Sequence, residues 1–138
     1  MKNVRFLTAV LFALMATGPM HAQQPLTPEQ KEKKMRESID NIVNRYEENL
    51  NLEVWQTFYV DSILTKNMGG MFEELESLGM NGVMNPDIYS RIQDKWDEAT
   101  YTAFRAILDE DQGAKYLKMG AGRAKKARDT RAAKREAN

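Results

Sequence analysis

The side chains best suited to chemistry in this chain of 138 residues are thioethers. Four methionines gather around a glycine pair and the loop that follows it: Met68, Met71, Met80 and Met84. Thioether sulfur is a soft ligand that suits Cu(I), and the spacing Met68-Gly-Gly-Met71 would let two sulfurs bind one ion. The same side chains are flexible apolar contacts that pack in cores or adapt to varied partners. The sequence leaves three roles open for them: packing, contact with partner proteins, and binding of copper or silver.

The rest of the composition excludes most catalytic chemistry. The chain has no cysteine and His21 is its only histidine, so it offers no thiolate nucleophile and no Cys-based zinc or iron–sulfur site. General acid–base catalysis near neutral pH usually relies on histidine. Asp109 and Asp111 are spaced like the start of a calcium loop, but Ala114 stands where that loop requires glycine. We therefore expect no enzyme activity and no cofactor.

The N-terminus has the form of a secretory signal peptide. Lys2 and Arg5 precede an apolar run over residues 6–16, and small and turn-forming residues follow it. The run has about 11 residues, short of the roughly 20 that span a bilayer. We predict a cleavable signal over residues 1–22, whose removal would also remove His21.

The spacing of apolar residues beyond this segment predicts an all-α chain. Helical patterns cover residues 28–50, 50–78, 86–107 and 109–119, and no alternation typical of a strand runs longer than three or four residues. We expect about four helices in a small antiparallel, hairpin-like bundle or cradle that forms a single domain over residues 23–119. The pair Gly69-Gly70 predicts a bend or break in the second helix, because glycine disfavours helix interiors.

A five-residue pattern recurs at three of the predicted helix starts. Its copies are Leu26-Thr27-Pro28-Glu29-Gln30, Leu52-Glu53-Val54-Trp55-Gln56 and Leu108-Asp109-Glu110-Asp111-Gln112. In a capping box, an oxygen-bearing side chain caps the helix and a glutamine three residues later returns the hydrogen bond. The pattern predicts N-caps at Thr27, Glu53 and Asp109. Since glutamate caps poorly, Asn51 is an alternative cap for the second helix.

These features in combination resemble a known family. The signal sequence, the length, the segments LTPEQ, LNLEVWQ and ILDEDQGAKY, and the basic C-terminal end together resemble the LTxxQ-motif periplasmic proteins, the Spy/CpxP-like family. The likeness covers most of residues 23–126. It implies a cradle-like helical homodimer in the periplasm that binds unfolded or stressed envelope proteins without ATP, or that modulates an envelope stress sensor. The copies at Leu52 and Leu108 depart from the family pattern by having an acidic residue in place of threonine.

The start of the second helix carries more apolar surface than one neighbouring helix can cover. Its apolar residues spread over roughly 240° of the helical projection. This helix is therefore either packed on several sides or keeps an apolar surface for another molecule. Large aromatic side chains supply much of the contact energy at protein interfaces. The residues predicted to contact the core, a second copy or a client protein are Trp55, Phe58, Tyr59, Ile63, Met68 and Met71.

A formal net charge of zero conceals two opposed blocks. Residues 23–114 hold 9 basic and 18 acidic side chains, whereas residues 115–138 hold 9 basic and 2 acidic ones. Because alanine supplies nearly all the apolar surface of residues 120–138, we expect a solvated, helical or fraying tail. Its basic residues are Arg123, Lys125, Lys126, Arg128, Arg131, Lys134 and Arg135.

The basic tail adds one more candidate role. Such a tail is suited to anionic lipid headgroups, to acidic partners or to the acidic part of its own chain, whereas export disfavours nucleic acid. A structural envelope protein that docks on a membrane through residues 120–138 is thus an alternative to the chaperone.

Overall fold

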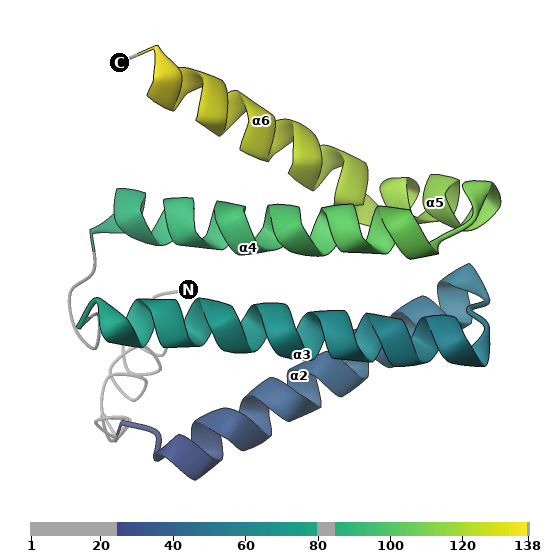
Figure 1. Ribbon diagram of the computed structural model, residues 1–138, viewed down its shortest axis with the longest axis horizontal. Helices are drawn as coiled ribbons and strands as arrows, with labels where there is room; N and C mark the ends of the chain where they lie inside the picture. Colours follow the sequence, from purple (N-terminus) through teal and green to yellow (C-terminus); the bar gives the residue numbers. More distant parts are fainter. Residues whose placement is uncertain (1–24, 80–84, 138) are drawn as a thin grey trace, which may run out of the picture.

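The computed structural model describes residues 25–79 and 85–137, which form helices joined by short connections and contain no strand. In chain order these are α2 (Pro28–Leu50), α3 (Val54–Ser77), α4 (Pro86–Ile107), α5 (Glu110–Tyr116), a π-helical turn η1 (Leu117–Ala121) and α6 (Gly122–Glu136) (Figure 1). The prediction of a small all-α bundle is confirmed. The predicted signal peptide, together with Met80 and Met84, lies outside the described residues.

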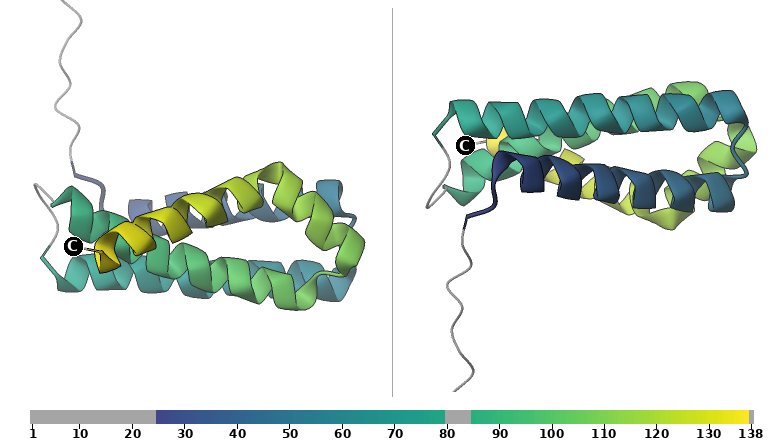
Figure 2. Two further views of the ribbon diagram at one scale, coloured as in Figure 1. Left: turned by 90° about the horizontal axis from the view of Figure 1, so that it is seen from above. Right: turned by 90° about the horizontal axis from the view of Figure 1, so that it is seen from below.

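Two helical hairpins build the molecule. One joins α2 to α3 and the other joins α4 to the arm formed by α5, η1 and α6 (Figure 1). Helices α3 and α4 run side by side and form the most extensive helix–helix interface. Helix α2 packs against α3 and α6 packs against α4, and the two outer helices diverge from the end where both hairpins turn (Figure 1). Seen from below, α2 and α3 run alongside each other (Figure 2). The arrangement is an open bundle.

The hydrophobic core lies between the two hairpins, near their turns. Ile39, Val43 and Leu50 supply it from α2, and Val60 and Leu64 from α3. Phe104 of α4 and Tyr116 of α5 close it with Tyr46 of α2, whose ring meets theirs edge-on at centroid distances of 5.6 and 5.7 Å. Aromatic rings prefer such edge-to-face contacts, which hold the second hairpin against the first.

The three predicted capping residues all begin helices. Thr27 Oγ1 accepts the Gln30 N–H at 3.2 Å, and Asp109 Oδ1 accepts the Gln112 N–H at 2.8 Å. Glu53 is the N-cap of α3, and its own N–H donates to Gln56 Oε1 at 2.9 Å. The alternative cap, Asn51, is wrong: it ends α2 in the left-handed conformation at φ 51°. Asparagine tolerates that conformation better than most residues.

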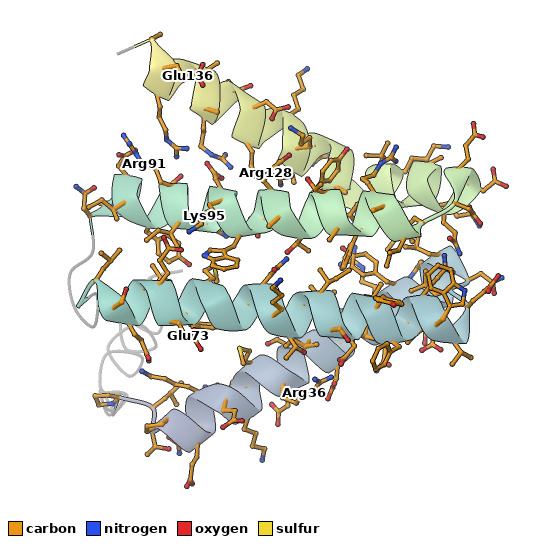
Figure 3. All side chains as sticks on the ribbon, in the orientation of Figure 1. Arg36, Glu73, Arg91, Lys95, Arg128 and Glu136 are labelled. Carbon is orange, nitrogen blue, oxygen red and sulfur yellow. The ribbon has the colours of Figure 1, made fainter. Side chains whose placement is uncertain are left out.

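Of the bend or break expected at Gly69-Gly70, the break is wrong, because α3 is continuous through both glycines. The packing explains why a glycine stands at position 70. A Cβ atom at this position would lie 2.4 Å from Cη2 of Trp96, so the absence of a side chain lets the indole ring of α4 rest on the α3 backbone. The indole N–H donates to Glu74 Oε2 at 2.7 Å, and Lys95, seen between α4 and α3 in Figure 3, donates to the same oxygen.

The C-terminal tail is helical, one of the two forms expected for it, but it packs against α4 instead of extending into solvent. Arg128 is buried beside α4 (Figure 3), where its Nε lies 3.1 Å from Glu98. Arg131 and Arg135 both bind Asp94, at 2.6 and 3.0 Å. The tail lacks apolar surface, but four of its basic residues pair with acidic residues of α4: Lys125, Arg128, Arg131 and Arg135. The opposed charge blocks of the sequence therefore meet within one chain.

Candidate protein-binding surface

Four large apolar side chains lie exposed at the start of α3. We call Val54, Trp55, Phe58 and Tyr59 the aromatic patch; their exposed fractions are 88, 47, 67 and 50%. Residues at positions i, i+1, i+4 and i+5 of a helix share one side of it, so the four form a continuous surface over two turns. The core-facing side of the same helix holds Val60 and Leu64. Helix α3 is thus both packed on two neighbours and apolar toward solvent.

The rings of the aromatic patch support one another. Trp55 and Tyr59 have centroids 6.1 Å apart and nearly perpendicular planes, and Phe58 and Tyr59 have the same arrangement at 5.8 Å. The indole N–H of Trp55 donates to Glu53 Oε2 at 2.7 Å, which orients the ring over the helix start. An open hollow borders the patch, lined by Leu52, Glu53, Val54, Trp55 and Phe58. The patch therefore presents an ordered apolar surface with a shallow concavity.

A buried pair of glutamines fixes the helix turn beneath the patch. Gln56 and Gln112 are 3 and 7% exposed and lie next to the two hairpin turns. Gln56 Nε2 donates to Gln112 Oε1 at 2.7 Å, and Gln112 Nε2 donates to Gln56 Oε1 at 2.9 Å. Each amide also donates to a backbone carbonyl of the opposite turn, Gln56 to Ile107 at 2.9 Å and Gln112 to Asn51 at 3.4 Å. The last two copies of the sequence pattern thus join the hairpins, whereas the copy at Gln30 makes an exposed cap.

Three predicted contact residues do not belong to the aromatic patch. Ile63 and Met68 pack against the core. Met71 is half-buried and lies 13 residues beyond Phe58 along α3, about 20 Å at 1.5 Å per residue. The sequence projection did not separate these positions from the patch, because apolar residues occur on most sides of α3. Of the two, only Met68 packs against the core, and the described residues hold no cluster of histidine, cysteine or carboxylate side chains fit for a metal ion.

Val54 is the residue that sequence reasoning omitted from the contact set. It is the most exposed large apolar side chain among the described residues. Its spacing of four residues from Phe58 is the signal that places it on the same helix face.

Four of the seven basic residues of α6 pair with α4. Lys125, Arg128, Arg131 and Arg135 form ion pairs with acidic residues of α4. The pKa of the Asp94 carboxyl lies below its ordinary value, mainly because Arg131 binds it. Arg135 adds to this lowering, and burial opposes it. Arg123, Lys126 and Lys134 are exposed. Most of the basic residues that could dock on a membrane or partner are therefore paired within the fold.

Comparisons with known proteins identify no relative: no protein-family model matches the chain, and neither the curated proteins nor the solved structures give a significant match. Among residues 25–79 and 85–137, every helix is too short or too polar to cross a bilayer.

Proposed function

We propose that the protein is a non-enzymatic, ATP-independent chaperone of the cell envelope that holds unfolded proteins on the aromatic patch. The observation that carries the proposal is the exposure of Val54, Trp55, Phe58 and Tyr59 on one face of an ordered helix. Contiguous exposed apolar surface on a soluble protein marks a site of interaction. The predicted signal peptide and the resemblance to the LTxxQ-motif proteins favour the periplasm and an unfolded client.

The physical basis is the gain from covering these side chains. Full burial of one large apolar side chain contributes about 1.5–3 kcal/mol, so partial burial of four outweighs much of the entropy that a bound segment loses. Aromatic groups accept many apolar sequences because their contacts depend on area more than on hydrogen-bond pattern. Since Gln56 and the ring contacts hold the surface in place, binding requires little ordering of the chaperone itself. A chaperone that must release its clients unaided needs such moderate, nonspecific affinity.

Two alternative functions, soft-metal binding and docking on a membrane through the basic tail, have less support. Soft-metal binding through the spacing Met68-Gly-Gly-Met71 would need the sulfur of Met68, which packs against the core. Docking through the basic tail would compete with the ion pairs that α6 makes with Asp94 and Glu98.

Suppression of aggregation tests the proposal. Purified protein without the predicted signal should keep chemically denatured malate dehydrogenase soluble, as measured by light scattering, at a near-stoichiometric ratio. The variant Phe58→Ser should lose most of this activity. The matched control is Leu78→Ser, which removes an apolar side chain of 54% exposure outside the patch and should behave like wild type. Equal suppression by the two variants would contradict the proposal.

A second copy of the chain is the other natural occupant of the patch, as the family resemblance implies a homodimer. Multi-angle light scattering of wild type and Phe58→Ser separates the two cases. If the patch serves clients, the mass of the wild type and of the variant should be the same. A dimer that dissociates on substitution would assign the patch to self-association instead.

A further inference from the structure

The two hairpin turns place an excess of negative charge around the aromatic patch. Residues 46–65 and 106–114, which span the two turns, contain several acidic residues and not one basic residue. The turns lie at the same end of the molecule (Figure 1), where Gln112 of α5 donates to the carbonyl of Asn51 in the α2–α3 turn. The carboxylates of this end are Glu47, Glu48, Glu53, Asp61, Asp109, Glu110 and Asp111.

Six of these carboxylates have no cationic partner among the described residues. Only Asp61 forms an ion pair, with Arg36 of α2. The other six residues are exposed and take no part in the ion pairs of the fold. The same is true of the basic residues that flank the two segments: Arg45, Lys66, Arg105 and Lys115. Unpaired negative charge therefore surrounds the end that carries the aromatic patch, whereas acidic and basic residues neutralise each other between α4 and α6.

Three of the six carboxylates belong to the α2–α3 turn that forms the hollow beside the patch. Glu53 lines the hollow, and its Oε2 accepts the indole N–H of Trp55. The carbonyl of Glu47 accepts the N–H of Leu52, another residue of the hollow, at 3.3 Å. Glu48 follows in the last turn of α2. A cation on a bound segment would meet these carboxylates together with exposed aromatic rings, whose faces also attract cations.

Helix stability does not account for all of this charge. The N-terminus of a helix favours negative charge, which explains Asp109, Glu110 and Asp111 at the start of α5. The C-terminus of a helix has the opposite preference. Glu47 and Glu48 nevertheless lie in the last turn of α2, which holds no basic residue. Their charges oppose the dipole of their own helix, so their value lies in contact with another molecule.

We propose that the aromatic patch selects apolar segments that carry lysine or arginine beside their large side chains. The proposal rests on the client binding proposed above and names the class of segment that is bound. The apolar side chains cover the patch, and the cationic side chains lie by Glu47, Glu48 and Glu53. Complementary charge speeds encounter and discriminates between partners. Because charge is screened beyond about 10 Å at 0.1 M salt, the charge next to each apolar run matters more than the net charge of a long unfolded chain.

Three matched peptides test this selectivity by isothermal titration calorimetry. They share one apolar sequence of leucine and phenylalanine, have blocked termini, and carry three lysines, three glutamines or three glutamates. At low ionic strength the lysine peptide should bind about tenfold more tightly than the glutamine peptide, because several exposed charge pairs each add a modest attraction. The glutamate peptide should bind most weakly. In about 1 M sodium chloride, where the Debye length is about 3 Å, most of the difference should disappear.

Two double variants locate the selectivity. Glu47→Gln/Glu48→Gln should bind the lysine peptide at least about threefold more weakly and the glutamine peptide as wild type does. Its urea midpoint should equal that of wild type or exceed it, because the substitutions remove charges that oppose the α2 dipole. The control is Glu32→Gln/Glu73→Gln, which removes the same charge from exposed positions toward the other end of α2 and α3 (Glu73 is labelled in Figure 3) and should bind every peptide as wild type does.

The outcomes separate this proposal from the proposed function. Equal affinity for the three peptides, with all binding lost in Phe58→Ser, would overturn the charge selectivity and leave the patch as the binding site. Failure of every peptide to bind would overturn both proposals. Tighter binding of the lysine peptide that persists unchanged in Phe58→Ser would place the cation site away from the patch and would also overturn the selectivity proposed here.

Discussion

Gln56 and Gln112 exchange two hydrogen bonds through their side-chain amides although 56 residues separate them. Each amide oxygen also accepts the N–H of its own helix cap, from Glu53 at 2.9 Å and from Asp109 at 3.0 Å. Each amide nitrogen also donates to a carbonyl of the opposite hairpin turn. Both amides are thereby fully satisfied in a buried position. The pair caps two helices and joins two hairpins at once.

We expect Gln112→Ala to lower the free energy of unfolding by about 2–3 kcal/mol, because it leaves the buried amide of Gln56 with missing partners. Gln56→Ala should have a similar effect. Urea denaturation followed by circular dichroism at 222 nm measures both. The control is Gln30→Ala, where the same sequence pattern forms an exposed cap and the expected loss is under about 1 kcal/mol.

The double variant Gln56→Ala/Gln112→Ala tests whether the two residues act as a pair. Its loss of stability should fall short of the sum of the single losses by about 1 kcal/mol or more, because residues in one hydrogen-bond network are coupled. Strict additivity would mean that each glutamine acts only on its own helix cap.

The two adjacent glycines of α3 should respond in opposite ways to the same substitution. Gly70→Ala should lower the free energy of unfolding by about 1–3 kcal/mol, because the added methyl would overlap the Trp96 ring. A methyl group added at Gly69 would meet no neighbouring element within 4 Å, so Gly69→Ala should raise stability by about 0.5–1 kcal/mol through helix propensity alone. Thermal unfolding of both variants measures the difference. Equal stabilisation by the two would show that Trp96 does not rest on Gly70.

The stability of the docked tail should depend on pH through Asp94. Arg131 holds the pKa of Asp94 below its ordinary value of 3.8, so the ionised form is favoured in the folded state. This contribution is fully present above about pH 3.8 and is lost as the pH falls below that value toward the lower pKa of the folded state. We expect it to be about 1 kcal/mol, since Arg131 is partly exposed.

Urea midpoints at pH 6 and pH 3 check this dependence. Wild type should lose more stability on acidification than Asp94→Asn does. Asp129→Asn is the control, because its ion pair with Lys125 lies exposed within α6 and should contribute under about 0.5 kcal/mol. A wild type and an Asp94→Asn variant with the same acid sensitivity would exclude Asp94 as the docking charge.

The local features of the fold were predictable and the long-range ones were not. Caps at Thr27 and Asp109 follow from residues within one helical turn, and the amphipathic spacing of α4 needs only its own sequence. The contact between Gly70 and Trp96 joins residues of different helices. The sequence alone shows only that glycine disfavours helices, and it therefore predicted a break at this position. The pairing of Gln56 with Gln112 is hidden for the same reason.

The candidate site was likewise predictable only where its features depend on a single helix. The apolar excess at Trp55 and Phe58 is a property of one helix and is visible in the sequence, but only the packing of α2 and α4 decides which apolar residues stay exposed. The sequence also shows that basic and acidic blocks oppose each other, whereas the kink at Gly120 decides that they meet along α4 and that Arg128 becomes buried.

The most direct test of the central claim is the affinity of the aromatic patch for a permanently unfolded protein. Isothermal titration calorimetry with reduced, carboxymethylated α-lactalbumin should show binding by wild type and by Leu78→Ser with equal affinity. Phe58→Ser should bind at least about tenfold more weakly, the loss expected when a central aromatic contact worth about 1.4 kcal/mol or more is removed. Wild type that does not bind, or Phe58→Ser that binds as tightly as wild type, would contradict the account.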